Sequence, residues 1–196
     1  IEAELRAYIE SVLPTVEGVV ISDYGSGTVT EGLQTLLIDY CRAKGIPSIV
    51  DSRYAVRRFS GIGYVKQNDA ELAAAVGREL ATTEDIIRAA EELREELHAK
   101  GVLVTRGELG MVLVESGAVH EIPVSDKSEV FDVSGAGDTC VATVILALAA
   151  GAEPALAARL SNIASGIAVR KLGTSTVSVR ELAEAVEKQH PEYPSK

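Results

Sequence analysis

The sequence predicts an α/β fold, because short apolar runs alternate along the chain with longer segments of helical periodicity. The 196 residues are 46% hydrophobic and 24% charged, which fits one folded domain with a sizeable core. The expected strands are Gly18–Asp23, Ser48–Asp51, Tyr64–Gln67, Val102–Thr105, Met111–Glu115 and Ala118–Ile122. The expected helices are 2–13, 31–44, 69–76, 83–100, 136–150, 154–172 and 179–188.

Helix caps and apolar periodicity justify the elements of the first part of the chain. Residues 2–13 carry apolar side chains at helical spacing, and Pro14 ends that run. Gly18–Asp23 is a continuous apolar run, as expected of a strand that is buried on both faces. The next helix has Thr30 as its N-cap and Gly45 after its last turn.

The middle of the chain continues the same alternation. The strand Tyr64–Gln67 is followed by Asn68, which caps a short helix. Residues 83–100 have one apolar helical face, and their charged outer face is typical of a solvated helix. Ser116-Gly117 joins the last two strands as an antiparallel hairpin. The alternation predicts a mostly parallel sheet that is covered by helices on both faces.

Composition excludes several classes of function. With 19 basic and 29 acidic side chains, the net charge is −10, which argues against a nucleic-acid partner. The most apolar run, Val141–Ala150, is too short to span a bilayer, so no membrane partner is expected. The two cysteines, Cys41 and Cys140, do not suggest a disulfide framework. We therefore expect a cytoplasmic protein.

Polar residues end or directly follow several of the expected strands, and one lies in a turn. They are Asp23, Asp51, Asn68, Thr105 and Asp132. Each alone fits a helix cap or a turn. Because ligands of open α/β sheets bind beyond the carboxyl ends of the strands, the five together favour a ligand site there.

The sharpest segment is Gly135-Ala136-Gly137-Asp138, which lies directly before a long apolar helix. A glycine-rich turn at a helix start offers unpaired N–H groups and the positive end of the helix dipole to an anion. Asp138 would repel that anion unless it takes a proton from an attacking hydroxyl. These residues favour phosphoryl transfer. The alternative is that Asp138 has no catalytic role and only interacts favourably with the helix dipole.

Four segments together resemble the ribokinase-like (PfkB) carbohydrate kinases. Asp132-Val133-Ser134-Gly135-Ala136-Gly137-Asp138-Thr139 is similar to the second signature of that family, and Asn68-Asp69-Ala70-Glu71 to its Asn-x-x-Glu motif. Residues 105–110 resemble its Thr-x-Gly-x-x-Gly nucleotide loop. Asn162 and residues 171–174 resemble the late helix and loop that surround the adenine.

The resemblance covers residues 16–186 and implies a three-layer α/β/α ribokinase-like fold. Nothing in the chain matches the Gly-Gly sugar-binding motif and the small β-sheet lid with which these kinases begin. We therefore expect a fragment or truncated gene product that lacks the N-terminal strands, the β-lid and most of the sugar site. Residues 1–188 would be the nucleotide-side portion of the kinase domain, and residues 189–196 a C-terminal tail.

Within the family, the likeness is greatest to the heptose 7-phosphate kinases, the kinase half of the enzyme of ADP-heptose synthesis. Ser22-Asp23-Tyr24-Gly25 and residues 171–178 carry this likeness. Three positions depart from the pattern: Ser26 replaces a Lys, Gln67 replaces a Pro, and Asp51-Ser52-Arg53 replaces Asp-Pro-Lys. Arg53, Arg57 and Arg58 could supply the lost positive charge.

The resemblance implies ATP and Mg²⁺ as cofactors and gives roles to the residues of the glycine-rich turn. Asp138 would be the general base that deprotonates the acceptor hydroxyl. Gly135, Ala136 and Gly137 would donate N–H groups to the transferred phosphoryl group.

The same resemblance implies roles for residues elsewhere in the chain. Asn68 and Glu71 would organise Mg²⁺, in part through water. Asp132 would help to bind the monovalent cation, such as K⁺, that many members use, unless it only caps a turn. The nucleotide groove would be formed by Thr105, Gly107 and Gly110, with Asn162 and Gly173 at the adenine end.

Three hypotheses of function follow. The first is an ATP-dependent phosphotransferase that converts heptose 7-phosphate to heptose 1,7-bisphosphate. The second is another PfkB-family sugar or sugar-phosphate kinase, and the third is a nucleotide-binding module without activity of its own. A sugar or sugar phosphate is the expected substrate. Because missing strands would leave an edge and a face uncovered, we also expect a homodimer or another homo-oligomer.

Overall fold

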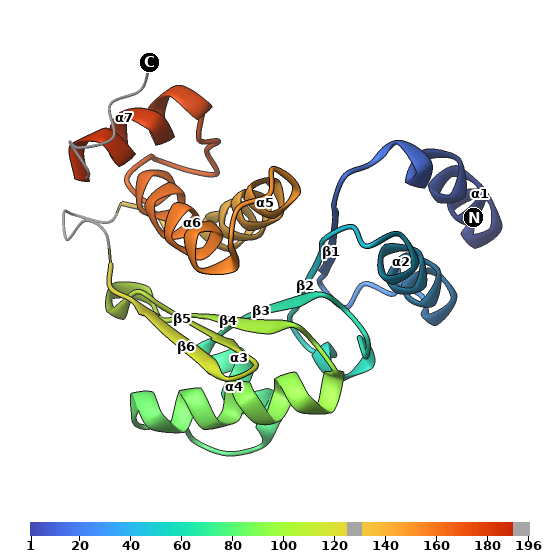
Figure 1. Cartoon of the computed structure of the whole chain (residues 1–196), viewed down its shortest axis with the longest axis horizontal. Coiled ribbons are helices and arrows are strands. Elements are labelled where there is room, and N and C mark those ends of the chain that lie inside the picture. Colours follow the sequence, from blue (N-terminus) through green and yellow to red (C-terminus); the bar gives the residue numbers. More distant parts are fainter. Residues whose placement is uncertain (125–130, 190–196) are drawn as a thin grey trace.

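The computed structural model describes residues 1–124 and 131–189, and it has three layers, with helices on both faces of a six-stranded sheet (Figure 1). The strand order β1-β2-β3-β4-β5-β6 follows the sequence. Neighbours from β1 to β4 are parallel, whereas β4–β5 and β5–β6 are antiparallel. The strands are Val19–Asp23 (β1), Ser48–Ser52 (β2), Tyr64–Asn68 (β3), Gly101–Thr105 (β4), Met111–Glu115 (β5) and Ala118–Ile122 (β6). The predicted α/β class and the final hairpin are confirmed.

The helices of the described residues also follow the predicted order. They are Glu2–Val12 (α1), Glu31–Lys44 (α2), Asp69–Val76 (α3), Thr83–Leu97 (α4), Ala136–Ala149 (α5), Pro154–Ala168 (α6) and Val179–Gln189 (α7). Three short 3-10 turns, Leu13–Thr15 (η1), Val56–Arg58 (η2) and Gly107–Leu109 (η3), lie in the connections. None of the described helices is long and apolar enough to cross a membrane.

Two predicted helix ends were wrong. Helix α4 stops at Leu97 rather than at residue 100, because His98 takes a left-handed conformation with φ of 52° and closes the helix. Helix α6 stops at Ala168 rather than at residue 172. After Ala168 the chain forms turns, in which the Arg170 and Lys171 amides donate to the Ile167 and Ala168 carbonyls. Residue 189 was predicted to begin the C-terminal tail, but Gln189 belongs to α7. The other residues of the predicted tail, 190–196, lie outside the described residues.

The capping predictions hold. The Thr30 side chain accepts a hydrogen bond from the Leu33 amide at the start of α2, and Gly45 ends that helix with φ of 69°. Asn68 caps α3 in the same way. These residues fix where each helix leaves the sheet, and hence where the carboxyl ends of the strands meet the helix starts.

Each face of the sheet packs against its own set of helices. Alternate residues of a strand point to opposite faces. Val50 and Val102 therefore lie in one core with side chains of α1 to α4, whereas Ile49 and Leu103 lie in the other with α5 and α6. Figure 1 shows α5 and α6 across the sheet from α3 and α4, with α7 packed on the outer side of α6. Burial on both faces explains why β2, β4 and β5 are largely apolar. The expectation that β1 is buried on both faces was wrong, because β1 lies at the edge of the described sheet and its buried and exposed residues alternate.

The connection between β4 and β5 contains a glycine that no other residue can replace without strain. Gly110 has φ of 84°, and its carbonyl accepts a hydrogen bond of 2.8 Å from the Arg106 amide. A Cβ at this position would lie 2.1 Å from the Ile122 carbonyl oxygen and 2.7 Å from the Val124 amide nitrogen. The turn therefore holds the start of β5 against the end of β6.

We expect Gly110→Ala to lower the free energy of unfolding by about 3 kcal/mol or more, because strain and backbone overlap combine. Gly117→Ala is the matched control, since Gly117 also has positive φ but has nothing within 4 Å of a Cβ. It should cost only about 1–2 kcal/mol. Urea unfolding followed by circular dichroism measures both, and equal losses would contradict this description of the turn.

Candidate active site

The start of α5 is built from the glycine-rich turn. Gly135 precedes the helix with φ of 79° and ψ of 0°, a conformation that favours glycine, and its carbonyl accepts the first helical hydrogen bond from Thr139. A Cβ on Gly137 would lie 3.1 Å from Nζ of Lys66 and 3.6 Å from Oδ2 of Asp51. The second glycine therefore lets the first turn of α5 pack directly on these two side chains.

Asp138 lies in this first turn and is exposed to solvent. The Tyr24 hydroxyl donates a hydrogen bond to Asp138 Oδ1 at 3.1 Å and lies 3.4 Å from Oδ2. This hydrogen bond and the charge of Asp138 raise the pKa of Tyr24. The carboxylate is thus reachable from solvent and already accepts a hydrogen bond from a hydroxyl group, as a base for a substrate hydroxyl must.

Beneath α5 lies a buried ion pair. Lys66 is 5% exposed, and its Nζ lies 2.9 Å from Asp51 Oδ2 and 3.9 Å from Glu71 Oε2. Burial raises the pKa of Asp51, and Lys66 partly offsets this. For Lys66, burial alone would lower the pKa, but the nearby carboxylates, chiefly Asp51, outweigh it and the pKa is raised. We expect Lys66 to be charged at neutral pH.

Asn68 and Glu71 form a reciprocal capping box at the start of α3. Asn68 Oδ1 accepts from the Glu71 amide at 2.7 Å, and Glu71 Oε2 accepts from the Asn68 amide at 2.8 Å. Both side chains therefore have a structural role. No group of three or more His, Cys, Asp or Glu side chains in residues 1–124 and 131–189 is arranged to hold a metal. A Mg²⁺ ion that is coordinated mainly by water and phosphate needs only one or two carboxylates from the protein, and Glu71 at the start of α3 can supply one.

Asp23 positions the loop that carries Tyr24. Its side chain is buried, its Oδ1 accepts from the Gly25 amide at 3.0 Å, and its Oδ2 accepts from the Ser52 hydroxyl at 2.9 Å. These bonds fix the chain just beyond β1 and β2. They explain how Tyr24 reaches Asp138, which is 114 residues away in the sequence.

The remaining predicted residues lie on other elements of the fold, and of these Thr105 is paired with Asn68 across β3 and β4. Asn162 is buried on α6, where its side chain donates to the Pro123 carbonyl at 2.7 Å. Asp132 accepts a hydrogen bond from the Ser134 amide, which lowers its pKa. Thr105, Gly107 and Gly110 belong to the turn between β4 and β5, and Gly173 has φ of 70° in the loop after α6.

A hollow of about 590 Å³ opens beside α5. Gly135, Asp138 and Thr139 line it from the start of α5, residues 174–178 line it from the loop before α7, and Val179 lines it from α7 itself. Of the predicted site residues, it brings together only Gly135 and Asp138.

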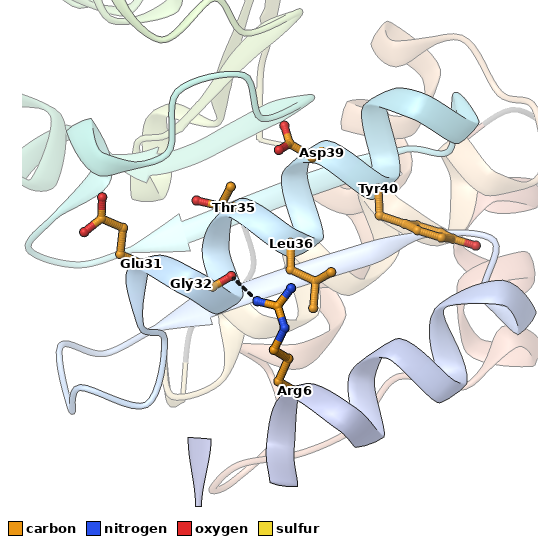
Figure 2. A pocket seen from close by; sticks show the side chains of 7 residues that line it. All are labelled: Arg6, Glu31, Gly32, Thr35, Leu36, Asp39 and Tyr40. Carbon is orange, nitrogen blue, oxygen red and sulfur yellow. Dashed lines mark hydrogen bonds between the residues drawn. The ribbon is translucent and has the colours of Figure 1, made fainter. Parts of the chain in front are cut away.

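A second, more open hollow, of about 630 Å³, lies between α1 and α2 (Figure 2). There the Arg6 guanidinium points from α1 to the Gly32 carbonyl, 3.5 Å away. Its lining contains none of the predicted site residues, so we place the site at α5.

Sequence reasoning gave no role to Lys66 or Tyr24. A lysine inside strand β3 was the available signal, because a strand buried on both faces has no solvent-exposed side for a charged group. Of the three arginines proposed to supply charge, Arg57 instead binds Glu96 of α4 at 3.0 Å and the Ala75 carbonyl at 2.9 Å. Arg58 donates to the Val29 carbonyl.

Comparison of the sequence with known proteins gives one family and a group of relatives. Residues 2–181 match the family model described as pfkB family carbohydrate kinase. The bifunctional protein HldE of Mesorhizobium japonicum is 40% identical over 191 residues, which are 96% of this chain and 38% of that protein. HldE of Pseudomonas aeruginosa is 41% identical over 192 residues, 95% of this chain and 39% of that protein. The chain thus spans about two fifths of these relatives.

Solved structures show the same fold. Phosphofructokinase-2 from Escherichia coli in complex with potassium superposes with a TM-score of 0.82 at 30% identity, over 96% of this chain and 62% of that one. Ribokinase from Arabidopsis thaliana, complexed with ribose and ATP, gives a TM-score of 0.80 at 20% identity, over 90% of this chain and 58% of that one. The second likeness concerns the fold alone.

Cys140, two residues after Asp138, is fully buried, and burial raises its pKa from 9.0 to about 11. The nucleophilic thiolate is therefore disfavoured in the folded protein. We expect iodoacetamide at pH 8 to leave Cys140 unmodified in the native chain and to alkylate it in urea, as followed by mass spectrometry. Since the folded pKa is the higher one, the stabilisation from this thiol is complete below pH 9 and is lost as pH rises towards 11. Rapid native alkylation would contradict the burial.

Proposed function

Because the chain belongs to the pfkB family of carbohydrate kinases, we propose that it is the nucleotide-side portion of an enzyme that transfers the γ-phosphoryl group of ATP to a sugar hydroxyl. One observation carries the proposal. The exposed Asp138 carboxylate, at a glycine-rich helix start, already accepts a hydrogen bond from a hydroxyl. A base beside an anion-binding helix start is the combination that phosphoryl transfer to an alcohol requires.

In the proposed mechanism, Asp138 takes the proton of the acceptor hydroxyl as the hydroxyl oxygen attacks the γ-phosphorus. The bond from the γ-phosphorus to the bridging oxygen breaks, and ADP leaves with the electron pair. The N–H groups of Gly135, Ala136 and Gly137 stabilise the charge on the transferred group. Mg²⁺ would be held beside Asn68 and Glu71, where it would neutralise charge on the phosphates. The carboxylate of Glu71, enclosed beside Lys66, fits such a role.

We propose that the residues named from the sequence also bind the remaining parts of the nucleotide, including the adenine. Thr105, Gly107 and Gly110 would shape the groove, and Asn162 and Gly173 would lie at the adenine end. Asp132 is proposed to contribute to a K⁺ site, supported by the potassium complex of phosphofructokinase-2 from Escherichia coli. We propose that the kinase portion, expected to end at residue 188, ends with α7 at Gln189, and that the tail begins at residue 190.

For the acceptor we propose heptose 7-phosphate, which would be converted to heptose 1,7-bisphosphate. The sequence motifs support this choice, as do the relatives at 40% identity. Another sugar or sugar-phosphate kinase is the second candidate, supported by the 30% identity to phosphofructokinase-2. A nucleotide-binding module without activity of its own is the third, because the chain spans only part of its relatives.

We also propose a homo-oligomer in the cytoplasm. Strand β1 is at the edge of the sheet in the described residues, and an open edge favours association. A tetrameric form is known for phosphofructokinase-2 from Escherichia coli. The two cysteines are free and buried, as suits a reducing compartment.

The nucleotide assignment predicts that the 196-residue chain binds Mg-ATP and Mg-ADP without any sugar. Isothermal titration should show a saturable heat at millimolar nucleotide or below, and the melting temperature should rise with nucleotide concentration. A folded chain with neither response would contradict the proposed function.

The base assignment predicts the effect of Asp138→Asn, measured in a chain that also carries the sugar-binding part of the relatives. Loss of the proton acceptor should lower kcat by about 10²–10⁴-fold. Affinity for ATP should hold or increase, because a negative charge near the γ-phosphate is removed. Glu31→Gln, another acid in a first helical turn, is the control and should leave kcat unchanged. Retained kcat with a lower Tm in Asp138→Asn would leave Asp138 only a structural role.

A further inference from the structure

The side chain of Tyr24 makes a contact that the proposed reaction does not use. Its hydroxyl donates a hydrogen bond to Asp138 Oδ1 at 3.1 Å and lies 3.4 Å from Oδ2. A general base takes the proton of an attacking hydroxyl from within hydrogen-bond reach. With respect to Asp138, the Tyr24 oxygen therefore already meets the distance requirement that the hydroxyl of a sugar acceptor must meet.

The backbone around Tyr24 is held in place, whereas its side chain is open to solvent. The buried Asp23 side chain accepts from the Gly25 amide and from the Ser52 hydroxyl. A Cβ on Gly25 would lie 3.0 Å from the Tyr54 ring, so this ring packs against the loop. Tyr24 itself is 60% exposed. The loop thus keeps the hydroxyl at the start of α5, and solvent beside the ring leaves room for an added phosphate group.

The protonation of the pair suits the transfer of a proton from Tyr24 to Asp138. The hydrogen bond to Asp138 and its charge raise the pKa of Tyr24 above the ordinary value of 10.0, so the phenol keeps its proton at neutral pH. A protonated hydroxyl is a weak nucleophile and needs an adjacent base to attack phosphorus. Asp138 already holds the phenol proton in a hydrogen bond and is placed to take it.

We propose that, when no sugar is bound, Tyr24 is itself the acceptor, so that the chain phosphorylates its own tyrosine. The inference rests on the proposed function, because it needs ATP at the start of α5 and Asp138 as the base. A bond forms between the Tyr24 oxygen and the γ-phosphorus, and the phenol proton passes to Asp138. The bond from the γ-phosphorus to the bridging oxygen breaks, and ADP leaves with the electron pair.

The charge of the product predicts how far the reaction goes. Phosphotyrosine is doubly charged or nearly so at neutral pH, and the carboxylates of Asp138 and Asp51 already act on Tyr24. Repulsion should therefore turn the phosphorylated ring away from the helix start towards solvent. Because Tyr24 is then used up, the reaction should stop at one phosphate per chain.

The test incubates the 196-residue chain with Mg-ATP and no sugar, and locates phosphate by tandem mass spectrometry of its peptides. We expect phosphate on Tyr24, at no more than one per chain and in step with the ADP formed. Tyr24→Phe keeps the ring, removes the acceptor oxygen and should abolish the modification. Tyr54→Phe is the matched control, because Tyr54 is an exposed tyrosine of the adjoining loop, and it should leave the yield unchanged.

The base and the geometry are tested with Asp138→Asn. Loss of the proton acceptor should slow the formation of phosphotyrosine by about 10²–10⁴-fold. Because Tyr24 is bonded to Asp138 of its own chain, the rate constant in the wild type should not depend on protein concentration. For the same reason, wild-type chain added to Asp138→Asn chain should leave Tyr24 of the variant unmodified.

A measurement without nucleotide tests the contact itself. In a chain labelled with ¹³C at tyrosine Cζ, nuclear magnetic resonance follows the ionisation of Tyr24, with Tyr24→Phe to assign its signal. Asp138→Asn removes the charge that raises the pKa of Tyr24, so this pKa should fall towards 10.0. An unchanged pKa would mean that the pair does not form in solution, and the proposal would be wrong.

The proposal and the proposed function can fail separately. If isothermal titration shows that Mg-ATP binds, but no phosphate appears on Tyr24, the proposal is overturned and the nucleotide assignment stands. Phosphate on another residue, or transfer between chains, overturns it equally. If the wild-type chain binds no nucleotide, the proposed function fails first and the inference with it.

Discussion

The contact between Lys66 and Asp51 is the constraint on which the candidate site depends. It joins neighbouring positions of β2 and β3, and the first turn of α5 rests on it through Gly137. Leaving one partner of a buried pair uncompensated costs about 3–5 kcal/mol, so the two residues hold each other in place. Glu71 extends the contact to α3, and Asp138 follows Gly137 directly. The proposed base Asp138, the Asn68–Glu71 pair and the start of α5 are therefore all positioned by the same buried ion pair.

Several candidate residues have structural work to do whatever they bind. Asn68 and Glu71 cap α3, Asp23 fixes the loop of Tyr24, and Asn162 ties α6 to the end of β6. A functional role and a structural role can coexist, because a side chain fixed by one hydrogen bond presents its remaining atoms in a defined direction. Because these residues also stabilise the fold, a loss of activity on substitution must be interpreted together with a measurement of stability.

Local signals in the sequence predicted most of the fold. Continuous apolar runs indicated the parallel strands, and Thr30, Gly45 and Asn68 marked helix ends because capping depends on a few neighbouring residues. The end of α4 was missed because a histidine in a left-handed conformation leaves no such signal. In the candidate site, the glycine-rich turn could be predicted, but Lys66 could not be paired with Asp51 before the register of β2 and β3 was known. The approach of Tyr24 to Asp138 likewise depends on packing between distant segments.

The sequential strand order has a consequence for how the chain folds during synthesis. Every strand pairs with its predecessor in the sequence, so the sheet can grow one strand at a time as the chain leaves the ribosome. One face of the sheet is covered by α1 to α4, which are synthesised between or before the strands. The other face is covered only after α5 and α6 have been synthesised. Until residue 168 has emerged, Ile49, Leu103 and Leu113 remain an apolar surface without a partner. That interval is when the nascent chain most needs a chaperone, and slow translation between β6 and α5 would prolong it.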